Sequence, residues 1–167
     1  IERGYMEYWT PPIQENTTEY WMKKAIELRY QGSFEESAQA YDQALQLDPE
    51  NATLWIGKAL DLGTIGRDDE SMRAYEKALE LTEETLKDDP QNALAWHRKG
   101  KILSNLGRED EASSAHETAL AIADKILEED MENTSALRIK AEALASLSLW
   151  DESLQALDKV IEINPSN

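Results

Sequence analysis

The sequence contains no cysteine, which excludes disulfide bonds, thiolate metal sites and cysteine nucleophiles. Only seven glycines and five prolines interrupt its 167 residues, so long helices are possible. No apolar run approaches the roughly 18 residues that a membrane-spanning helix needs, and we expect no membrane partner. A cysteine-free chain suits a reducing compartment, and we therefore predict a cytoplasmic location.

Positive charge is also scarce. Seventeen Lys and Arg face 34 Asp and Glu, which gives a net charge of −17. A field of this sign repels the phosphates of nucleic acids, so we expect no nucleic-acid partner. Two interpretations of the charge stay open: it keeps the chain soluble and monomeric, or it recruits a basic partner. The 41% of hydrophobic residues favours a folded chain.

What the sequence does contain is a repeat. The matching positions Trp21, Trp55, Trp96 and Leu137 are 34, 41 and 41 residues apart. An apolar pair follows each of them after 23 residues, starting at Ala44, Ala78, Ala119 and Val160. Each unit closes on an asparagine: Asn51, Asn92, Asn133 and Asn167. The predicted units are therefore 18–51, 52–92, 93–133 and 134–167, preceded by an unrelated segment, 1–17.

Each unit has the pattern of two helices. The first helix stops at a glycine in three units and at Ser148 in the last; the glycines are Gly32, Gly66 and Gly107. Paired acidic residues such as Glu35-Glu36 then open the second helix, where they suit the helix macrodipole. The two middle units carry seven-residue insertions, 82–88 and 123–129, that preserve helical phase. We predict longer second helices there, which either form a ridge for a partner or pack against each other.

Two further features recur in every unit. Small residues stand where the two helices of a hairpin approach each other: Ala25, Ala59, Gly100 and Ala141 on the first helix, with Ser37, Ser71, Ala112 and Ser153 on the second. A lysine lies three residues after the matching Trp or Leu: Lys24, Lys58, Lys99 and Lys140. The lysine stems can cover apolar surface while the ammonium groups reach water or an acidic neighbour. We interpret both features as structural.

These motifs resemble the tetratricopeptide repeat family. Its pattern W-x2-L-G-x2-Y, then A-x3-F and later P, corresponds here to Trp55, Lys58-Ala59, Leu62, Ser71-Tyr75 and a delayed Pro90. The resemblance implies an all-α fold, a right-handed superhelix of four helical hairpins, whose first helices line a concave groove. The family's chaperone-peptide clamp of lysines and asparagines is not matched, because only Arg98 fits it.

The resemblance also implies which side chains face the groove. The first two units contribute an apolar set: Met22, Ile26, Tyr30, Ile56 and Leu60. The last two contribute a polar set: His97, Lys101, Asn105, Arg138 and Glu142. We therefore predict a protein-interaction scaffold whose groove binds a peptide or protein segment with apolar or aromatic anchors and acidic groups. The competing interpretation is that these residues pack against each other or against the N-terminus.

The chain ends suggest a second function. Residues 1–17 include Trp9 and Thr10-Pro11-Pro12, and so aromatic a segment either caps the first helix or docks in a groove. At the other end Leu154, Leu157 and Ile161 are expected to be partly uncovered. Either the natural protein continues beyond residue 167, or this end packs against another copy. The alternative function is thus self-association, a homo-oligomer formed through the terminal repeats or the N-terminal segment.

Nothing in the sequence predicts an enzyme. Of the two histidines, His116 replaces the aromatic residue found at Tyr41 and Tyr75, which favours a core position. His97 lies in the predicted groove without an evident nucleophile in reach. No phosphate-binding loop, EF-hand or His-Glu-x-x-His motif occurs. We expect no catalytic residues, no metal site and no cofactor.

Overall fold

The computed structural model describes residues 16–165 of the chain. This part is all-α and contains no strand. Its helices are α1 (Thr18–Tyr30), α2 (Phe34–Leu47), α3 (Ala52–Thr64), α4 (Asp68–Asp88), α5 (Ala93–Asn105), α6 (Glu109–Glu129), α7 (Thr134–Ser146) and α8 (Trp150–Ile163). Most of the predicted N-terminal segment, 1–17, and the closing Asn167 of the last unit lie outside the described residues.

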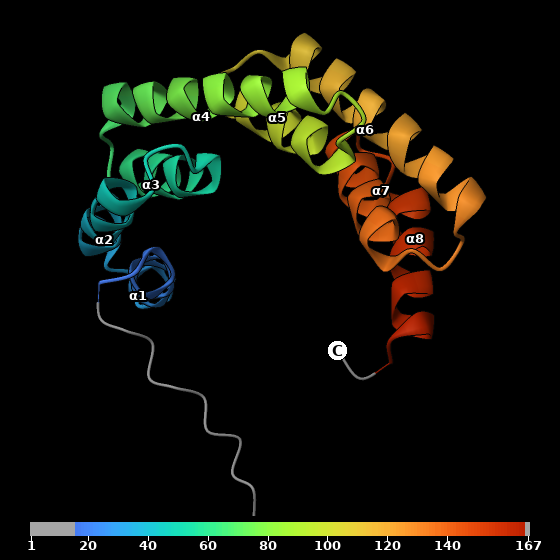
Figure 1. Ribbon diagram of the computed structural model, residues 1–167, viewed down its shortest axis with the longest axis horizontal. Helices are drawn as coiled ribbons and strands as arrows, with labels where there is room; N and C mark the ends of the chain where they lie inside the picture. The colour runs from blue at the N-terminus through green and yellow to red at the C-terminus, as the bar shows by residue number, and fades with distance from the viewer. Residues whose placement is uncertain (1–15, 166–167) are drawn as a thin grey trace, which may run out of the picture.

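The helices follow one another around an open arc of stacked hairpins (Figure 1). Each helix packs on its neighbour in the chain, with α1 on α2, α3 on α4, α5 on α6 and α7 on α8. In the middle of the arc, α3, α5 and α7 lie on the inner side, and α4 and α6 lie on the outer side. The predicted all-α superhelix is confirmed.

The second helices are unequal in length, as the insertions predict. Helices α4 and α6 each contain 21 residues, whereas α2 and α8 contain 14. Seven additional residues extend a helix by about 10 Å at 1.5 Å per residue. Both long helices continue their buried stripe into the insertion, with Leu86 at 8% exposure and Ala123 at 0%.

Asparagine and glycine fix the helix ends. Asn51, Asn92 and Asn133 are the N-caps of α3, α5 and α7, and each side chain accepts a hydrogen bond from a backbone N–H of the first turn at 3.0–3.1 Å. The turns inside the hairpins contain a residue with positive φ, which is a glycine three times and Ser148, at φ 62°, in the last hairpin. The left-handed conformation costs a residue with a side chain about 1 kcal/mol.

Replacing Ser148 with glycine should therefore raise the free energy of unfolding by about 0.5–1 kcal/mol, since glycine adopts this conformation without a Cβ clash. The matched reverse change is Gly107→Ser, at φ 73° with open space around its Cα, and it should destabilise by a similar amount. Urea unfolding of both variants measures the effect. Equal stability of the two variants would contradict this assignment of strain.

The recurring small residues form hydrogen bonds between the helices of a hairpin. The Ser37 hydroxyl donates to the Ala25 carbonyl at 2.7 Å. The same bond joins Ser71 to Ala59 at 2.7 Å and Ser153 to Ala141 at 2.8 Å. The third hairpin has Ala112 instead of serine, and a Cβ on its Gly100 would lie 2.5 Å from the His116 ring. The predicted close approach is confirmed, and three of the four contacts add a buried polar bond.

Candidate functional site

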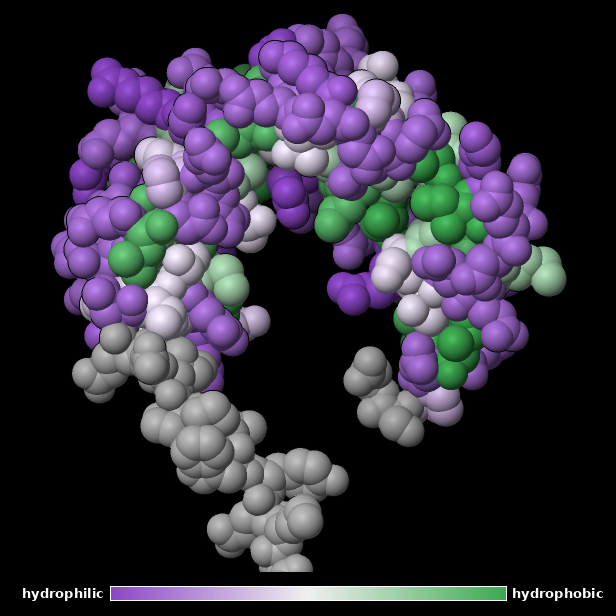
Figure 2. All heavy atoms as spheres, viewed as in Figure 1, coloured by the Kyte–Doolittle hydropathy of each residue, from purple (hydrophilic) through white to green (hydrophobic). Residues whose placement is uncertain are grey.

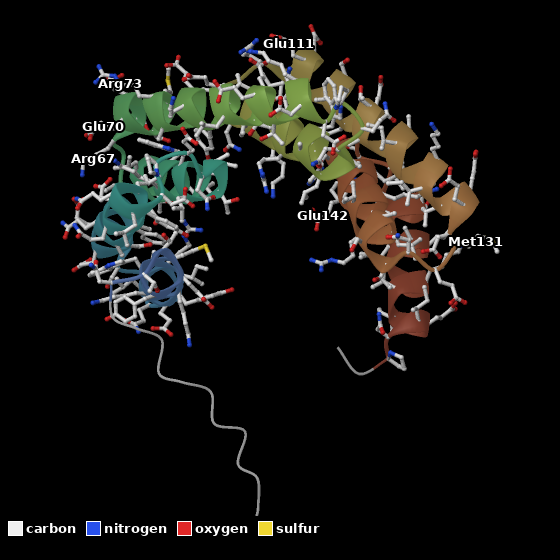
Figure 3. All side chains as sticks on the ribbon, viewed as in Figure 1. Arg67, Glu70, Arg73, Glu111, Met131 and Glu142 are labelled. Atoms are coloured by element: carbon white, nitrogen blue, oxygen red, sulfur yellow. The ribbon has the colours of Figure 1, made fainter. Side chains whose placement is uncertain are left out.

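The inner side of the arc encloses an open hollow, which Figure 2 shows in space-filling form. Figure 3 shows Glu142 on α7 pointing into this hollow, whereas Arg67, Glu70, Arg73 and Glu111 lie on the outer side. The outer charges pair locally: Arg67 binds Glu70 at 2.7 Å and Arg108 binds Glu111 at 2.6 Å, both as neighbours three residues apart. The candidate groove is therefore the surface of the first helices α1, α3, α5 and α7.

The predicted apolar set divides by exposure. Ile26 on α1 and Leu60 on α3 are 38% and 42% exposed, and Tyr30 at the end of α1 is 89% exposed. Met22 and Ile56 are half-buried and pack against the core. Ile26, Tyr30 and Leu60 are therefore the accessible members of this set.

The predicted polar set lies on α5 and α7, and three of its members line two hollows: Arg138 and Glu142 in one, Asn105 in the other. One hollow of about 180 Å³ lies between α5 and α7 and is lined by Leu94, Ser135, Arg138, Ile139 and Glu142. A second, of about 610 Å³, brings Asn105 beside Leu60 and Tyr75 at the ends of α3 and α5. Lys101 is exposed, and its backbone carbonyl accepts a bond from the Asn105 side chain at 2.8 Å.

His97 differs from the other predicted groove residues because it is buried, at 3% exposure. Its Nδ1 lies 3.2 Å from Nδ1 of His116, which is also 3% exposed. Its Nε2 lies 3.1 Å from the Glu142 carboxylate. Gly100 has no side chain, and this leaves room for the His116 ring beside α5. The predicted core position of His116 is confirmed.

Burial, assisted by the nearby Lys101 and Arg98 cations, lowers the pKa of His97 to about 4. Burial also lowers the pKa of His116 to about 4, assisted by His97 and Lys101 and opposed by Glu109. Both rings are therefore neutral at pH 7. One of the two facing Nδ1 atoms donates to the other. Since His97 Nε2 lies beside the Glu142 carboxylate, this contact brings the buried pair to the edge of the hollow.

A buried ionic network joins the first two hairpins, and nothing in the repeat pattern predicts it. Asp61 on α3 is 1% exposed and accepts from Arg29 Nε at 2.7 Å. The Ser37 hydroxyl lies 2.6 Å from the other Asp61 oxygen and bridges it to the Ala25 carbonyl. Arg29 also donates to the Gly57 carbonyl at 2.7 Å. Burial disfavours the Arg29 cation, but its bond to Asp61 prevails and raises its pKa.

The recurring lysines form a ladder across the joints between units. Lys58 pairs with Asp42 at 2.5 Å, Lys99 with Glu83 at 2.8 Å, and Lys140 with Asp124 at 2.6 Å. Three of the lysines also lie over a tryptophan: Lys24 over Trp21, Lys58 over Trp55 and Lys99 over Trp96, at 5.1–5.6 Å from the ring centroid. The predicted structural role of the ladder is confirmed for the last three lysines.

Arg98, the one residue that fits the family's clamp pattern, is a further cation on α5. It is half-buried on α5, and burial lowers the pKa of its guanidinium. Within residues 16–165, no carboxylate lies within 4.0 Å of Arg98, Lys101 or Arg138.

The described residues hold no converging group of three or more metal-ligating side chains. Within the same residues, every buried side-chain nitrogen or oxygen has a hydrogen-bond partner. The arrangement therefore offers surface contacts, cations and apolar side chains rather than an unsatisfied polar group aimed at a substrate.

Two sequence profiles of the tetratricopeptide repeat family match the chain, one over residues 50–125 and one over 25–60. Together with the eight helices in hairpin order within residues 16–165, they decide the family. The chain is a tetratricopeptide repeat protein. In the part of this repeat protein that the structure describes, no helix is both long and apolar enough to cross a membrane.

Solved structures similar to this tetratricopeptide repeat protein include a crystal structure of MamA, at 18% identity and a TM-score of 0.44, covering 90% of this chain and 80% of that one. MamA from Desulfovibrio magneticus RS-1 is similar at 15% identity and a TM-score of 0.40, covering 90% and 77%. The second tetratricopeptide domain of Spaghetti (RPAP3), bound to an HSP90 peptide, is similar at 22% identity and a TM-score of 0.45, covering 63% and 91%. No curated protein sequence matches the chain significantly.

Proposed function

We propose that the concave face binds an extended polypeptide segment. The apolar side chains of this segment contact α1 and α3, and its acidic side chains contact the cations of α5 and α7. As a tetratricopeptide repeat protein, the chain has the architecture of a protein-interaction scaffold. The observation that carries the proposal is the change in chemistry along one inner surface. Exposed Ile26 and Leu60 are followed by Lys101 and Arg138, which have no carboxylate partner within residues 16–165.

The cations support an acidic ligand for an electrostatic reason. The whole chain carries −17, so most approaching acidic segments are repelled. Glu142 lines the same hollow as Arg138, and its carboxylate lies 3.1 Å from Nε2 of His97. Lys101 and Arg138 therefore keep donors available for carboxylates of a ligand, and such charge-assisted bonds are stronger than neutral ones. A locally positive groove in an acidic protein would also fix the direction of the bound segment.

Reversing both charges with Lys101→Glu and Arg138→Glu should weaken ligand binding by about a hundredfold, since each lost contact changes to a repulsion worth about 1–2 kcal/mol. The probe is a synthetic peptide array in which two aromatic or aliphatic residues precede a cluster of Asp and Glu. Affinity is measured by fluorescence anisotropy on the peptides that bind best. Helical content, measured by circular dichroism, should not change because both side chains are exposed.

The matched control is Lys87→Glu with Lys125→Glu, which makes the same charge change on exposed positions of α4 and α6. Its binding should stay within about threefold of the original, as expected for screened, distant charges. A second arm replaces the apolar anchors with Ile26→Ser and Leu60→Ser and should also weaken binding. Equal affinity for the groove variants and the control variant would remove the concave face as the binding site.

Self-association is the second candidate function, and a specific observation favours it. The last helix, α8, leaves three apolar side chains exposed along one side: Leu154 at 59%, Leu157 at 40% and Ile161 at 60%. A stripe of this kind indicates a surface that packs against another helix.

A further inference from the structure

Two of the exposed apolar side chains of α8, Leu157 and Ile161, have buried counterparts in the first two units. Trp150, Leu154, Leu157 and Ile161 are 40–61% exposed, and apolar side chains reach the surface at this end of the arc (Figure 2). Counting back 116 residues, Leu157 and Ile161 correspond to Tyr41 and Leu45, which are 4% and 7% exposed. The same positions in the second unit, Tyr75 and Leu79, are 4% and 8% exposed.

In the earlier units the next first helix provides the cover. Helix α3 packs on α2 and places Trp55 against the cluster that contains Tyr41 and Leu45. The Trp55 indole donates to the carbonyl of Pro49, in the turn after α2, at 2.8 Å. Trp96 of α5 repeats this bond with the carbonyl of Pro90 at 2.9 Å. The cover is therefore a tryptophan-bearing helix anchored on the preceding turn.

Charge fixes the register of each joint. In all three lysine pairs the acidic partner lies 16 residues before the lysine: Asp42 before Lys58, Glu83 before Lys99, and Asp124 before Lys140. On α8 the residue that corresponds to Asp42 is Asp158. No cation lies within 4.0 Å of Asp158 among residues 16–165.

Helix α1 carries the complementary half of this joint at the other end of the arc. Trp21 and Lys24 correspond to Trp55 and Lys58, and Lys24 lies over the Trp21 ring at 5.1 Å. In the described part of the chain, no carboxylate pairs with Lys24. The Trp21 indole donates only to Asn16, at 3.3 Å and in an exposed position.

We propose that copies of this chain stack head to tail, with α1 of one copy covering α8 of the next. The proposal rests on self-association as the second candidate function and specifies its surface and register. Trp21 packs on Leu157 and Ile161, and Lys24 pairs with Asp158 as a fourth rung of the ladder. The Trp21 indole takes the carbonyl of Pro165, which corresponds to Pro49. Such an interface joins two different surfaces, so it continues the superhelix into an open filament.

Side-chain size at the joint is compatible with this register. Lys23 corresponds to Gly57, where a Cβ would lie 2.4 Å from the Tyr41 ring. The other internal joints nevertheless accommodate large residues at this position, Arg98 and Ile139. On α8 the facing residue is Leu157, which is smaller than Tyr41. The main opposition is the −17 charge of each copy, so added salt should strengthen stacking.

The test is sedimentation velocity of the full chain over a wide range of concentration. The unmodified protein should associate progressively, without stopping at a dimer. Lys24→Glu alone and Asp158→Lys alone should each weaken association about tenfold or more, because each replaces an attraction with a repulsion. An equimolar mixture of the two variants should regain the association, since the glutamate introduced at position 24 of one copy then faces the lysine introduced at position 158 of the other. Lys87→Glu is the control for charge alone and should not weaken it.

Other outcomes separate the possible failures. A monomer at every concentration overturns both the stacking and self-association as a function. Association that neither Lys24→Glu nor the exposed Ile161→Asp weakens overturns the proposed surface but leaves self-association standing. If Trp9→Ser abolishes association and Lys24→Glu does not weaken it, residues 1–15 rather than α1 of another copy cover the α8 stripe. Rescue by the mixed variants is the result that only a Lys24–Asp158 register predicts.

Discussion

Replacing Asp61 with alanine should lower the free energy of unfolding by about 3 kcal/mol, the lower part of the range for breaking a buried ion pair. Asp61 is 1% exposed and holds both Arg29 and the Ser37 hydroxyl at 2.6–2.7 Å. Without the carboxylate, the Arg29 cation keeps only the Gly57 carbonyl as a partner. The expected loss of unfolding free energy is small for a buried ion pair because the Arg29 side chain is 30% exposed and can still reach water.

The measurement is urea unfolding of three variants beside the unmodified protein. Asp42→Ala is the matched control, since it removes a carboxylate that is 47% exposed from the pair with Lys58, and it should cost less than about 1 kcal/mol. Arg29→Met combined with Asp61→Leu should recover most of the loss, because it removes both charges and fills the space with apolar atoms. A loss for Asp61→Ala no larger than that of the control would show that the network adds little to stability.

Acidification should destabilise the fold through His97 and His116. Their pKa values are about 4 in the folded chain, against about 6.5 in an unfolded one. The unfolded chain therefore binds more protons as pH falls, so this contribution to stability is complete above pH 6.5 and is lost towards pH 4. Between pH 7.5 and 5 the loss is about 2 kcal/mol for each imidazole. Glu142, at 3.1 Å from His97, attracts the protonated ring, so His116 should show the larger effect.

His116→Tyr isolates this contribution. Tyrosine stands at the corresponding positions 41 and 75, and Gly100 leaves room for the larger ring. The unmodified protein should lose about 2 kcal/mol more than this variant between pH 7.5 and 5, after the titration common to both is subtracted. Chemical denaturation at each pH gives the difference, and NMR titration of the two imidazoles checks their pKa values directly. Parallel pH curves for the two proteins would contradict the assignment.

The proposed groove depends on which side chains of the first helices are exposed, and the repeat pattern predicts this only in part. Tetratricopeptide resemblance implied that first helices face inward, and Ile26, Leu60, Lys101 and Arg138 are exposed on those helices. His97 is buried instead, because its neighbour at the matching aromatic position is a histidine beside Gly100. Exposure at one position of a repeat thus depends on the residue that fills the space behind it.

The recurring helix ends, helix lengths and close helix contacts could be predicted from the sequence alone. The helix ends at Asn51 and Gly107, the seven-residue extensions of α4 and α6, and the close contact of Ser37 with Ala25 follow from local chemistry repeated in several units. Caps, turns and phase are properties of a few neighbouring residues, so each copy of the pattern is independent evidence for the others.

Contacts that occur once became visible only in the packed structure. Arg29 and Asp61 are 32 residues apart, and the His97–His116–Glu142 chain spans three helices. No repeat marks these contacts, because they depend on the angle at which one hairpin packs on the next and on how deeply each group is buried. The lysine ladder belongs partly to each group. Its 16-residue spacing is present in the sequence, but only the packed joints show that Lys58 pairs with Asp42.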